Sequence, residues 1–408
     1  MWTVLVERML TRLLQQGHLQ IIWPDGRKAF YGDGSGPLVE IGITDASICK
    51  ELCLRPELAL GEGYMDGRIA VAPNQLGPFL AMLVRNRSGN SFSAWIKVVE
   101  KLRNQMRTWM LKNNPRSSQQ NVAHHYDISD DLYRLFLDED MQYSCAYFAA
   151  PDMTLDQAQI AKKRHIAQKL RIKPGMEVLD IGCGWGGMAL TLAKEFGARV
   201  TGVTLSENQL ATAQARAEAA GLADVCKFEL RDYRTLDRQF DRIVSVGMFE
   251  HVGPAHYGEY FEQVNRLLTD EGIALIHTIC YSQPPRTQSA WILKYIFPGG
   301  HVPALSEIAP AIEHAGLWQM DIEILRLHYA ETLLHWRDRF EAQVDTVQRM
   351  YDDQFVRMFR FYLVACEMSF REMHQAVYQF QLAKRINAVP ITRDYLYTDT
   401  PPGSIASE

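Results

Sequence analysis

Short apolar runs alternate with helix-like segments along the middle of the chain. The apolar runs predict strands, and the segments after Gly187 and over residues 207–220 predict helices. The expected strands cover residues 177–180, 199–203, 226–230, 242–246 and 273–277. Strands separated by helices form parallel sheets with helices on both faces. The pattern therefore predicts an α/β fold with a doubly wound, mostly parallel sheet.

Residues 1–95 mix helix-like and strand-like patterns and predict a small α+β domain. A hairpin-type turn is expected at Pro24-Asp25-Gly26, and a loop is expected over residues 32–37. Nothing in this region has the pattern of a catalytic site.

After Ile279 the alternation is interrupted by an insertion at residues 284–303 and then resumes. The insertion fits a lid that also enters a membrane interface, and it fits a buried crossing loop equally well. Residues 331–386 predict helix, and their apolar stripe is more typical of core than of a cofactor site. The expected division is 1–95, a basic helix and linker at 96–120, a larger α/β domain with helical insertions at 121–390, and a tail at 391–408.

The linker region is locally basic. Six basic residues stand against the single acid Glu100, with Trp95, Trp109 and Met110 among them: Lys97, Lys101, Arg103, Arg107, Lys112 and Arg116. This composition fits contact with anionic lipid headgroups and fits a solvated connector equally well.

The composition of the whole chain narrows the classes of protein to which it can belong. The 408 residues carry a formal net charge of −5, which gives no reason to expect nucleic acid as a partner. No apolar stretch reaches the ~20 residues that span a bilayer, and no secretory signal is expected. Seven scattered cysteines fit free thiols in a reducing compartment, so we expect a cytoplasmic protein. Cys49 and Cys53 lack a second ligand pair and predict packed thiols, so no metal is expected.

A glycine-rich turn follows the first strand of the alternating region. Its sequence is Asp180-Ile181-Gly182-Cys183-Gly184-Trp185-Gly186. Such a turn lets backbone approach a ligand closely, but alone it is a weak signal, and a purely structural turn remains an alternative. The acid two residues before the first glycine would repel a pyrophosphate and would pair with a cationic amino group. The turn therefore favours S-adenosylmethionine over a dinucleotide.

Several ordered motifs resemble those of one family. They are Ala123-His124-His125-Tyr126-Asp127-Ile128-Ser129, Gln142 to Phe148, Leu179 to Gly187, Thr204 to Gln209, Phe249-Glu250-His251-Val252-Gly253 and His277-Thr278-Ile279. From Gln120 to the last helix the chain is similar to the cyclopropane fatty acid synthases and their mycolic acid relatives. Residues 1–95 resemble the leading domain of the phospholipid-acting members. The resemblance implies a sheet of the S-adenosylmethionine methyltransferase type, in a methyltransferase domain with helical lipid-binding insertions at residues 121–390. It also implies transfer of a methylene group from S-adenosylmethionine to the cis double bond of an unsaturated phospholipid acyl chain, through a carbocation.

The resemblance also assigns cofactor contacts. They are Tyr143, Ser144, Val178, Leu179, Asp180, Ile181, Gly182, Cys183, Gly184, Trp185, Gly186, Thr204, Leu205, Ser206, Glu207, Asn208, Gln209, Tyr233 and Arg234. Many methyltransferases end their second strand in an acid that holds the ribose, and this chain has Thr204-Leu205-Ser206 there. Ribose contacts are therefore expected from the loop of residues 204–209. The Tyr233-Arg234 pair departs from the Trp-Glu of some relatives.

A bound bicarbonate is the base that the resemblance implies, held by Cys145, Glu250, His277, the backbone of Ile279, and Tyr329. Taken singly, Cys145, His277 and Tyr329 fit buried core positions; together, in family motifs, they favour a site. An ionised Glu250 cannot donate, so it is expected to orient His277 or to accept the proton of bicarbonate. Cys366 matches a cysteine once proposed as catalytic, although packing explains it better.

Other outcomes remain open. The same carbocation can give methyl-branched or methylene lipids, and some relatives methylate small amines. A lipid-binding protein without turnover is a further alternative. The leading interpretation places the chain peripherally on the inner face of the membrane, with unsaturated phospholipid as partner and a possible homodimer.

Overall fold

The computed structural model describes residues 1–87 and 129–397. Contacts divide them into two compact units. One holds residues 1–87, 287–298 and 330–375, and the other holds residues 129–286, 299–329 and 376–397. The predicted basic segment at 96–120 and most of the motif at 123–129 lie outside the described residues.

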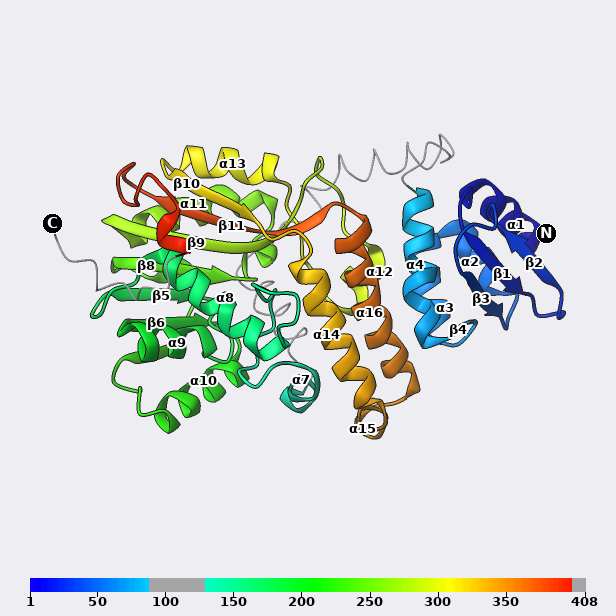
Figure 1. Ribbon diagram of the computed structural model, residues 1–408, viewed down its shortest axis with the longest axis horizontal. Helices are drawn as coiled ribbons and strands as arrows, with labels where there is room; N and C mark the ends of the chain where they lie inside the picture. Colours follow the sequence, from blue (N-terminus) through cyan, green and yellow to red (C-terminus); the bar gives the residue numbers. More distant parts are fainter. Residues whose placement is uncertain (88–128, 398–408) are drawn as a thin grey trace. The chain divides into compact units, whose positions relative to one another are not determined.

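Seven strands form the sheet of the second unit, in the order β10-β11-β9-β8-β5-β6-β7 (Figure 1). They are β5 (Glu177–Ile181), β6 (Arg199–Thr204), β7 (Cys226–Leu230), β8 (Phe240–Val246), β9 (Leu268–Tyr281), β10 (Trp318–Ile324) and β11 (Gln375–Ala383). The run from β7 to β9 is parallel, while β10 and β11 pair antiparallel. The α/β, mostly parallel prediction is confirmed. Strand order reverses at β5, and the carboxyl end of the strands at such a point is where α/β folds bind ligands.

Helices cover both faces of this sheet. On one face α8 (Leu155–Leu170), α9 (Gly187–Phe196) and α10 (Glu207–Ala219) pack over Val178, Val200 and Val244. On the other face α11 (Tyr257–Leu267) and α13 (Leu305–His314) pack over Leu179 and Ile243. Neighbouring strand residues therefore enter opposite cores, which explains why the strands are nearly continuous apolar runs. A short helix, α7 (Asp130–Phe136), precedes them.

The prediction of helix over residues 331–386 is wrong at its end. Helices α14 (His328–Ala342), α15 (Val344–Met350) and α16 (Asp353–Glu372) fill most of the range, and β11 follows. Every residue of β11 after Gln375 is buried, because the strand lies inside the sheet. An apolar run that is buried on both faces cannot be told from a buried helix by periodicity.

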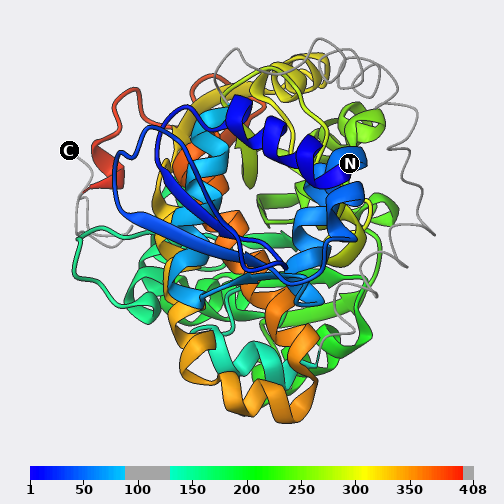
Figure 2. The ribbon, with the colours of Figure 1, turned by 90° about the vertical axis from the view of Figure 1, so that its right-hand side faces the viewer.

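Residues 1–87 contain a four-stranded sheet in the order β2-β1-β3-β4, which can be followed in blue and cyan in Figures 1 and 2. The strands are β1 (His18–Ile22), β2 (Lys28–Tyr31), β3 (Leu38–Ile43) and β4 (Ile69–Val71), and the helices are α1 (Trp2–Leu13), α2 (Ile48–Leu54), α3 (Pro56–Met65) and α4 (Pro73–Arg87). The predicted turn at Pro24-Asp25-Gly26 joins antiparallel β1 and β2, with Gly26 at φ +79°.

Within the same unit, α12 (Ala290–Tyr295) of the insertion packs on α3. The Trp291 side chain is buried, and its ring meets Phe361 edge-on with centroids 4.7 Å apart. Lys294 and Tyr295 both donate to Glu62 Oε1, at 2.6 and 2.8 Å. The environment of Trp291 is that of a buried crossing segment, one of the two alternatives for this insertion.

A close approach explains a glycine inside α3. A Cβ on Gly61 would overlap the indole ring of Trp291. We predict that Gly61→Ala lowers the free energy of unfolding by about 1 to 3 kcal/mol, the usual cost of overpacking. Gly77→Ala in α4 is the control, because its Cβ would meet only Val364 Cγ1 at 3.8 Å. Helix propensity then raises stability by up to about 1 kcal/mol. Denaturant titration of both variants checks this, and equal effects would contradict the proposed contact.

Among the helices that the structure describes, none is long and apolar enough to cross a membrane.

Candidate active site

The glycine-rich turn lies at the carboxyl end of β5 and leads into α9. Gly182 and Gly186 have φ of +78° and +85°, in the left-handed region that favours glycine, and Gly186 is the N-cap of α9. A Cβ on the next residue, Gly187, would overlap the side chains of Asp140 and Gln142. The missing side chain therefore lets the segment of residues 140–144 approach the start of α9.

A cavity opens at this turn and is lined by most of the predicted cofactor contacts. Those lining it are Tyr143, Ser144, Asp180, Ile181, Gly182, Cys183, Gly184, Trp185, Thr204, Leu205, Gln209, Tyr233 and Arg234. The remaining six do not line it: Val178 and Leu179 lie in the two cores, Gly186 and Ser206 cap helices, and Glu207 and Asn208 are exposed. Gln142, Asp232, Met248 and His251 also line the cavity and were not predicted as cofactor contacts, although Gln142 and His251 belong to the quoted family motifs.

The loop after β6 is held by its own polar side chains. Thr204 Oγ1 donates to Gln209 Oε1 at 3.0 Å, and the Ser206 backbone amide donates to Thr204 Oγ1 at 3.2 Å. Ser206 Oγ in turn accepts from the Gln209 backbone amide and caps α10. The loop is therefore preorganised at the cavity wall, where ribose contacts are expected.

Asp232 holds the side chain of Arg234 at the cavity. The Arg234 guanidinium donates from Nε and Nη2 to the two carboxylate oxygens, at 2.9 and 2.6 Å. Although burial opposes it, this bidentate pair keeps the pKa of Asp232 below its usual range. Arg234 is thereby fixed by its neighbour.

Asp180 is a buried carboxyl group at the cavity. Only 2% of it is exposed, and its Oδ2 has no hydrogen-bond partner in the described part of the chain. Burial raises the pKa of Asp180 to about 7, while the ammonium of Lys162 acts to lower it. An unsatisfied buried carboxyl oxygen fits a cationic group such as the amino group of the methionine part of S-adenosylmethionine.

A hydrogen bond joins Glu250, beyond the end of β8, to Ile279, near the carboxyl end of β9. Glu250 stands on the short 3₁₀ turn Phe249–His251, and its Oε1 accepts from the Ile279 amide at 2.7 Å. Its other oxygen, Oε2, is buried without a hydrogen-bond partner among residues 1–87 and 129–397. Burial raises the pKa of Glu250, and the bond from Ile279 acts against that rise.

His277 lies two residues before Ile279 on β9 and is buried. Gln379 Nε2 on β11 donates to His277 Nδ1 at 3.1 Å. With Nδ1 accepting, the proton of the neutral ring is on Nε2, which has no partner within the described ranges. Burial holds the pKa of His277 well below its usual range. Glu250 was expected to orient His277, but the side chain that forms a hydrogen bond with this ring is Gln379.

Cys145, Ile279 and Tyr329 pack into one apolar cluster with Leu325 and Val377. Cys145 is buried, and its thiol donates to the Ala146 carbonyl at 3.3 Å. Because Ile279 donates a hydrogen bond to Glu250, this cluster lies next to the Glu250 carboxyl group. The structure thus brings together four of the predicted catalytic residues, with His277 on the same strand.

Cys366 belongs to the other unit, on α16. Burial raises the pKa of its thiol to about 12, so it stays protonated at neutral pH. A catalytic role for Cys366 therefore receives no electrostatic support and stays a prediction.

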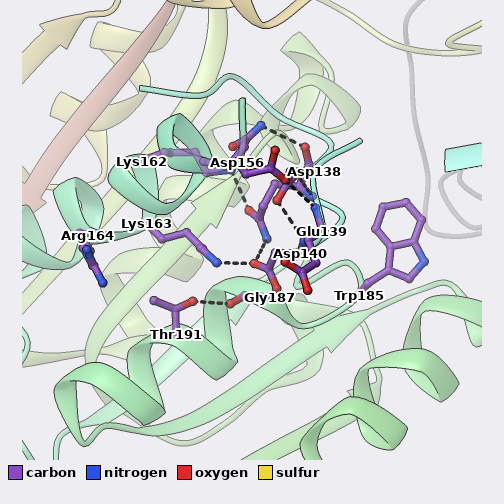
Figure 3. A network of polar contacts seen from close by, with 12 residues as sticks. Asp138, Glu139, Asp140, Asp156, Lys162, Lys163, Arg164, Trp185, Gly187 and Thr191 are labelled. Carbon is purple, nitrogen blue, oxygen red and sulfur yellow. Dashed lines mark hydrogen bonds and ion pairs between the residues drawn. The ribbon is translucent and has the colours of Figure 1, made fainter. Parts of the chain in front are cut away.

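A polar network lies beside the turn, and the sequence motifs do not predict it (Figure 3). Asp140 forms ion pairs with Lys163 of α8 and Arg216 of α10, and Arg216 Nη1 also donates to the Trp185 carbonyl at 2.8 Å. Lys162, the neighbour of Lys163, is fully buried and donates to Gln142 Oε1 and Ser144 Oγ, both at 2.7 Å. The network joins the turn to residues 140–144 on the cavity wall.

Comparison with known proteins gives consistent matches. The family model described as mycolic acid cyclopropane synthetase matches residues 113–380, and a domain of unknown function matches residues 5–90. The chain is 37% identical to a cyclopropane-fatty-acyl-phospholipid synthase of Escherichia coli, over 88% of this chain and 92% of that protein. It is 40% identical to a probable fatty acid methyltransferase of Pseudomonas putida, over 70% and 75%.

Among solved structures, a mycolic acid cyclopropane synthase in complex with S-adenosylhomocysteine (SAH) and CTAB superposes with a TM-score of 0.62 at 34% identity. The match covers 65% of this chain and 97% of that one. Fold, cofactor turn and matches agree, and the chain belongs to the cyclopropane synthase family of S-adenosylmethionine-dependent methyltransferases.

Proposed function

We propose that this enzyme transfers a methylene group from S-adenosylmethionine to the cis double bond of an unsaturated acyl chain in membrane phospholipid. The product is a cyclopropane fatty acid, and bicarbonate acts as the base. The observation that carries the proposal is that two of the predicted site residues each keep a buried polar atom without a hydrogen-bond partner in the described part of the chain, His277 Nε2 and Glu250 Oε2.

These two atoms suit a small anion that still carries one proton. The N–H of His277 is a donor and the free Glu250 oxygen is an acceptor, so together they match an anionic oxygen and an O–H group. Tyr329 and Cys145 complete the apolar wall, and the Ile279 amide fixes Glu250. A bound bicarbonate would supply a base that is small enough to reach a methyl group in an apolar site.

The reaction needs no base to begin. The π electrons of the alkene form a bond to the sulfonium methyl carbon, the carbon–sulfur bond breaks, and the cofactor leaves as a neutral thioether. The positive charge is then on the acyl chain. Loss of one proton from the new methyl group supplies the electrons that close the ring. Because the alkene is a weak nucleophile, positioning must supply much of the rate enhancement.

The phospholipid assignment rests on the first 90 residues. The match to the solved mycolic acid enzyme covers 65% of this chain, whereas the match to the Escherichia coli phospholipid enzyme covers 88%. A separate domain over residues 5–90 supports a substrate that the mycolic acid enzymes do not share. The same proposal includes the division of the chain into four parts, with boundaries at residues 95, 120 and 390. It also includes a cytoplasmic location at the inner face of the membrane, reached through residues 96–120, and a homodimer.

The test is incubation of the purified full chain with methyl-labelled S-adenosylmethionine and vesicles of unsaturated phospholipid. We expect label in the acyl chains and the high-field proton NMR signals of a cyclopropane ring. Label that never enters lipid would overturn the proposal.

A methyl-branched product is the second candidate, favoured by the similarity to a probable fatty acid methyltransferase. A methyl-branched chain is two hydrogens heavier than the cyclopropane chain, so mass spectrometry separates them. An exocyclic methylene product has the same mass as the cyclopropane and is separated by NMR. Small amines are tested as acceptors in the same assay.

The hydrogen bond from Gln379 gives a prediction about His277. Gln379→Met removes the donor that fixes the ring tautomer, and misplacement of a catalytic group costs about 10²-fold in rate. We expect turnover to fall by about that factor with SAH affinity unchanged. The control is Gln381→Met on the same strand, which is equally buried but bonds the Lys169 carbonyl and Tyr395. Equal loss of turnover in both variants, measured with their thermal stability, would indicate damage to β11 instead.

A further inference from the structure

Lys162 is a buried cation without a negative partner. It stands on α8 with none of its surface exposed, and both of its hydrogen-bond acceptors, Gln142 Oε1 and Ser144 Oγ, are neutral. No carboxylate of the described residues lies within ion-pair distance of it. Burying an uncompensated charge is costly. The next buried lysines on this helix differ, because Lys163 pairs with Asp140 and Lys169 with Glu323.

The two acids that act to raise the pKa of Lys162, Asp138 and Asp140, already have other partners. Asp138 raises the pKa of Lys162, but its own oxygens accept from the backbone amides of Asp140 and Gln142, at 3.1 and 2.8 Å. Burial lowers the pKa of Lys162 to about 8, so the group is still mostly protonated at neutral pH. A positive charge therefore remains beside the cavity.

Both acceptors of Lys162 line the cofactor cavity. Gln159, three residues earlier on α8, donates to the Ser144 carbonyl at 2.9 Å and holds the same segment. Because Ser144 Oγ accepts from Lys162, its own hydroxyl proton is directed elsewhere and can be donated to a ligand. The cavity wall thus presents a donor that a buried ammonium polarises.

We propose that Lys162, acting through Ser144, forms the carboxylate-binding half of the cofactor site, with Asp180 as the ammonium-binding half. The amino acid end of S-adenosylmethionine is a zwitterion. The buried acid Asp180 lines the cavity, and the buried ammonium of Lys162 contacts it through Ser144. The negative charge that Lys162 lacks is supplied by the ligand. Lys162 is a positioning residue in this scheme. The inference rests on the cofactor assignment within the proposed function, and not on the lipid chemistry.

Two ligands separate this role from a structural one. SAH carries the amino acid end, whereas 5′-methylthioadenosine keeps the adenosine and thioether but lacks that end. Isothermal titration of the full chain with both ligands measures each affinity. We expect Lys162→Met to weaken SAH binding by about 10- to 100-fold, the range for a lost charge-assisted hydrogen bond, and to change 5′-methylthioadenosine binding by less than about twofold.

The matched control is Arg164→Met, which removes a positive charge from the same helix. Arg164 is exposed, pairs with Glu195, and points away from the network in Figure 3. It should leave both affinities unchanged. If Lys162→Met does not fold, Ser144→Ala should show the same selective loss.

Equal losses for both ligands, or no loss for either, would overturn the inference, as would a wild-type chain that does not bind SAH. A third outcome is possible, in which Lys162→Met loses affinity for SAH alone and the wild-type chain makes no lipid product. That outcome would support the role of Lys162 and overturn the proposed lipid reaction.

Discussion

Glu250→Gln should lower turnover by about 10²- to 10⁴-fold, the usual contribution of a general base or its partner, while SAH affinity stays within about twofold. The amide keeps the shape of the side chain, but it cannot present two acceptor oxygens. One oxygen accepts from the Ile279 amide, and the other is buried without a hydrogen-bond partner among the residues that the structure describes. The substitution therefore removes either the acceptor for the base or the anchor of Ile279.

The pH profile gives this prediction a second readout. Burial raises the pKa of Glu250, so the carboxylate form is lost as pH falls at a higher pH than for an exposed glutamate. We expect the acidic limb of kcat/KM to lie above the usual glutamate range in the wild type and to disappear from the residual activity of Glu250→Gln. The control is Glu259→Gln on α11, the same change at an exposed carboxylate that pairs with His256. Full activity in Glu250→Gln would contradict the site.

Asp180→Asn should have opposite effects on cofactor binding and on stability. Removing the buried carboxylate costs the ligand a charge-assisted bond, so SAH affinity should fall by about 10- to 100-fold. In the wild type that affinity should rise with pH towards a plateau above about 7, because a cation binds the ionised form and Asp180 has a pKa of about 7. The variant should lack this rise. Titration calorimetry between pH 6 and 8 checks both.

The effect of Asp180→Asn on the free energy of unfolding follows from the same raised pKa of Asp180. The pKa of Asp180 is raised from 3.8 to about 7 in the folded, unliganded protein, so the folded state holds a proton that the unfolded state has released. Stability is therefore lost as pH rises from about 4 to 7, by roughly 4 kcal/mol at 1.36 kcal/mol per unit. Asp180→Asn escapes this loss, so the unliganded variant should be more stable than the wild type at pH 8. Lower stability of the variant at that pH would contradict the account of Asp180.

The sequence predicted the parts of the site that lie close together along the chain. The turn at 180–186 is local, and its acid, its glycines and the strand before it were all visible in one short segment. The strand pattern from β5 to β9 was equally clear, because each run is short and is bounded by a helix. The family motifs then located Cys145, Glu250, His277 and Tyr329.

The partners that fix those residues were harder to predict. Gln379 was hidden because β11, buried on both faces, resembles a helix in its apolar content. Lys162 looks like one more charged residue of an amphipathic helix, and its burial depends on residues 142–144, which the fold brings against α8. The ion pairs of Asp140 join residues 23 and 76 positions away. Only the folded chain reveals such contacts.

The central claim is that a proton leaves the transferred methyl group after it reaches the acyl chain. S-Adenosylmethionine with a trideuterated methyl group tests this directly, with unsaturated phospholipid vesicles as acceptor and mass spectrometry of the acyl chains as readout. The proposed reaction gives a product that keeps two deuterium atoms on the added carbon and shows the ring signals of a cyclopropane. A product that keeps all three would show that the methyl group is never deprotonated, and would contradict it.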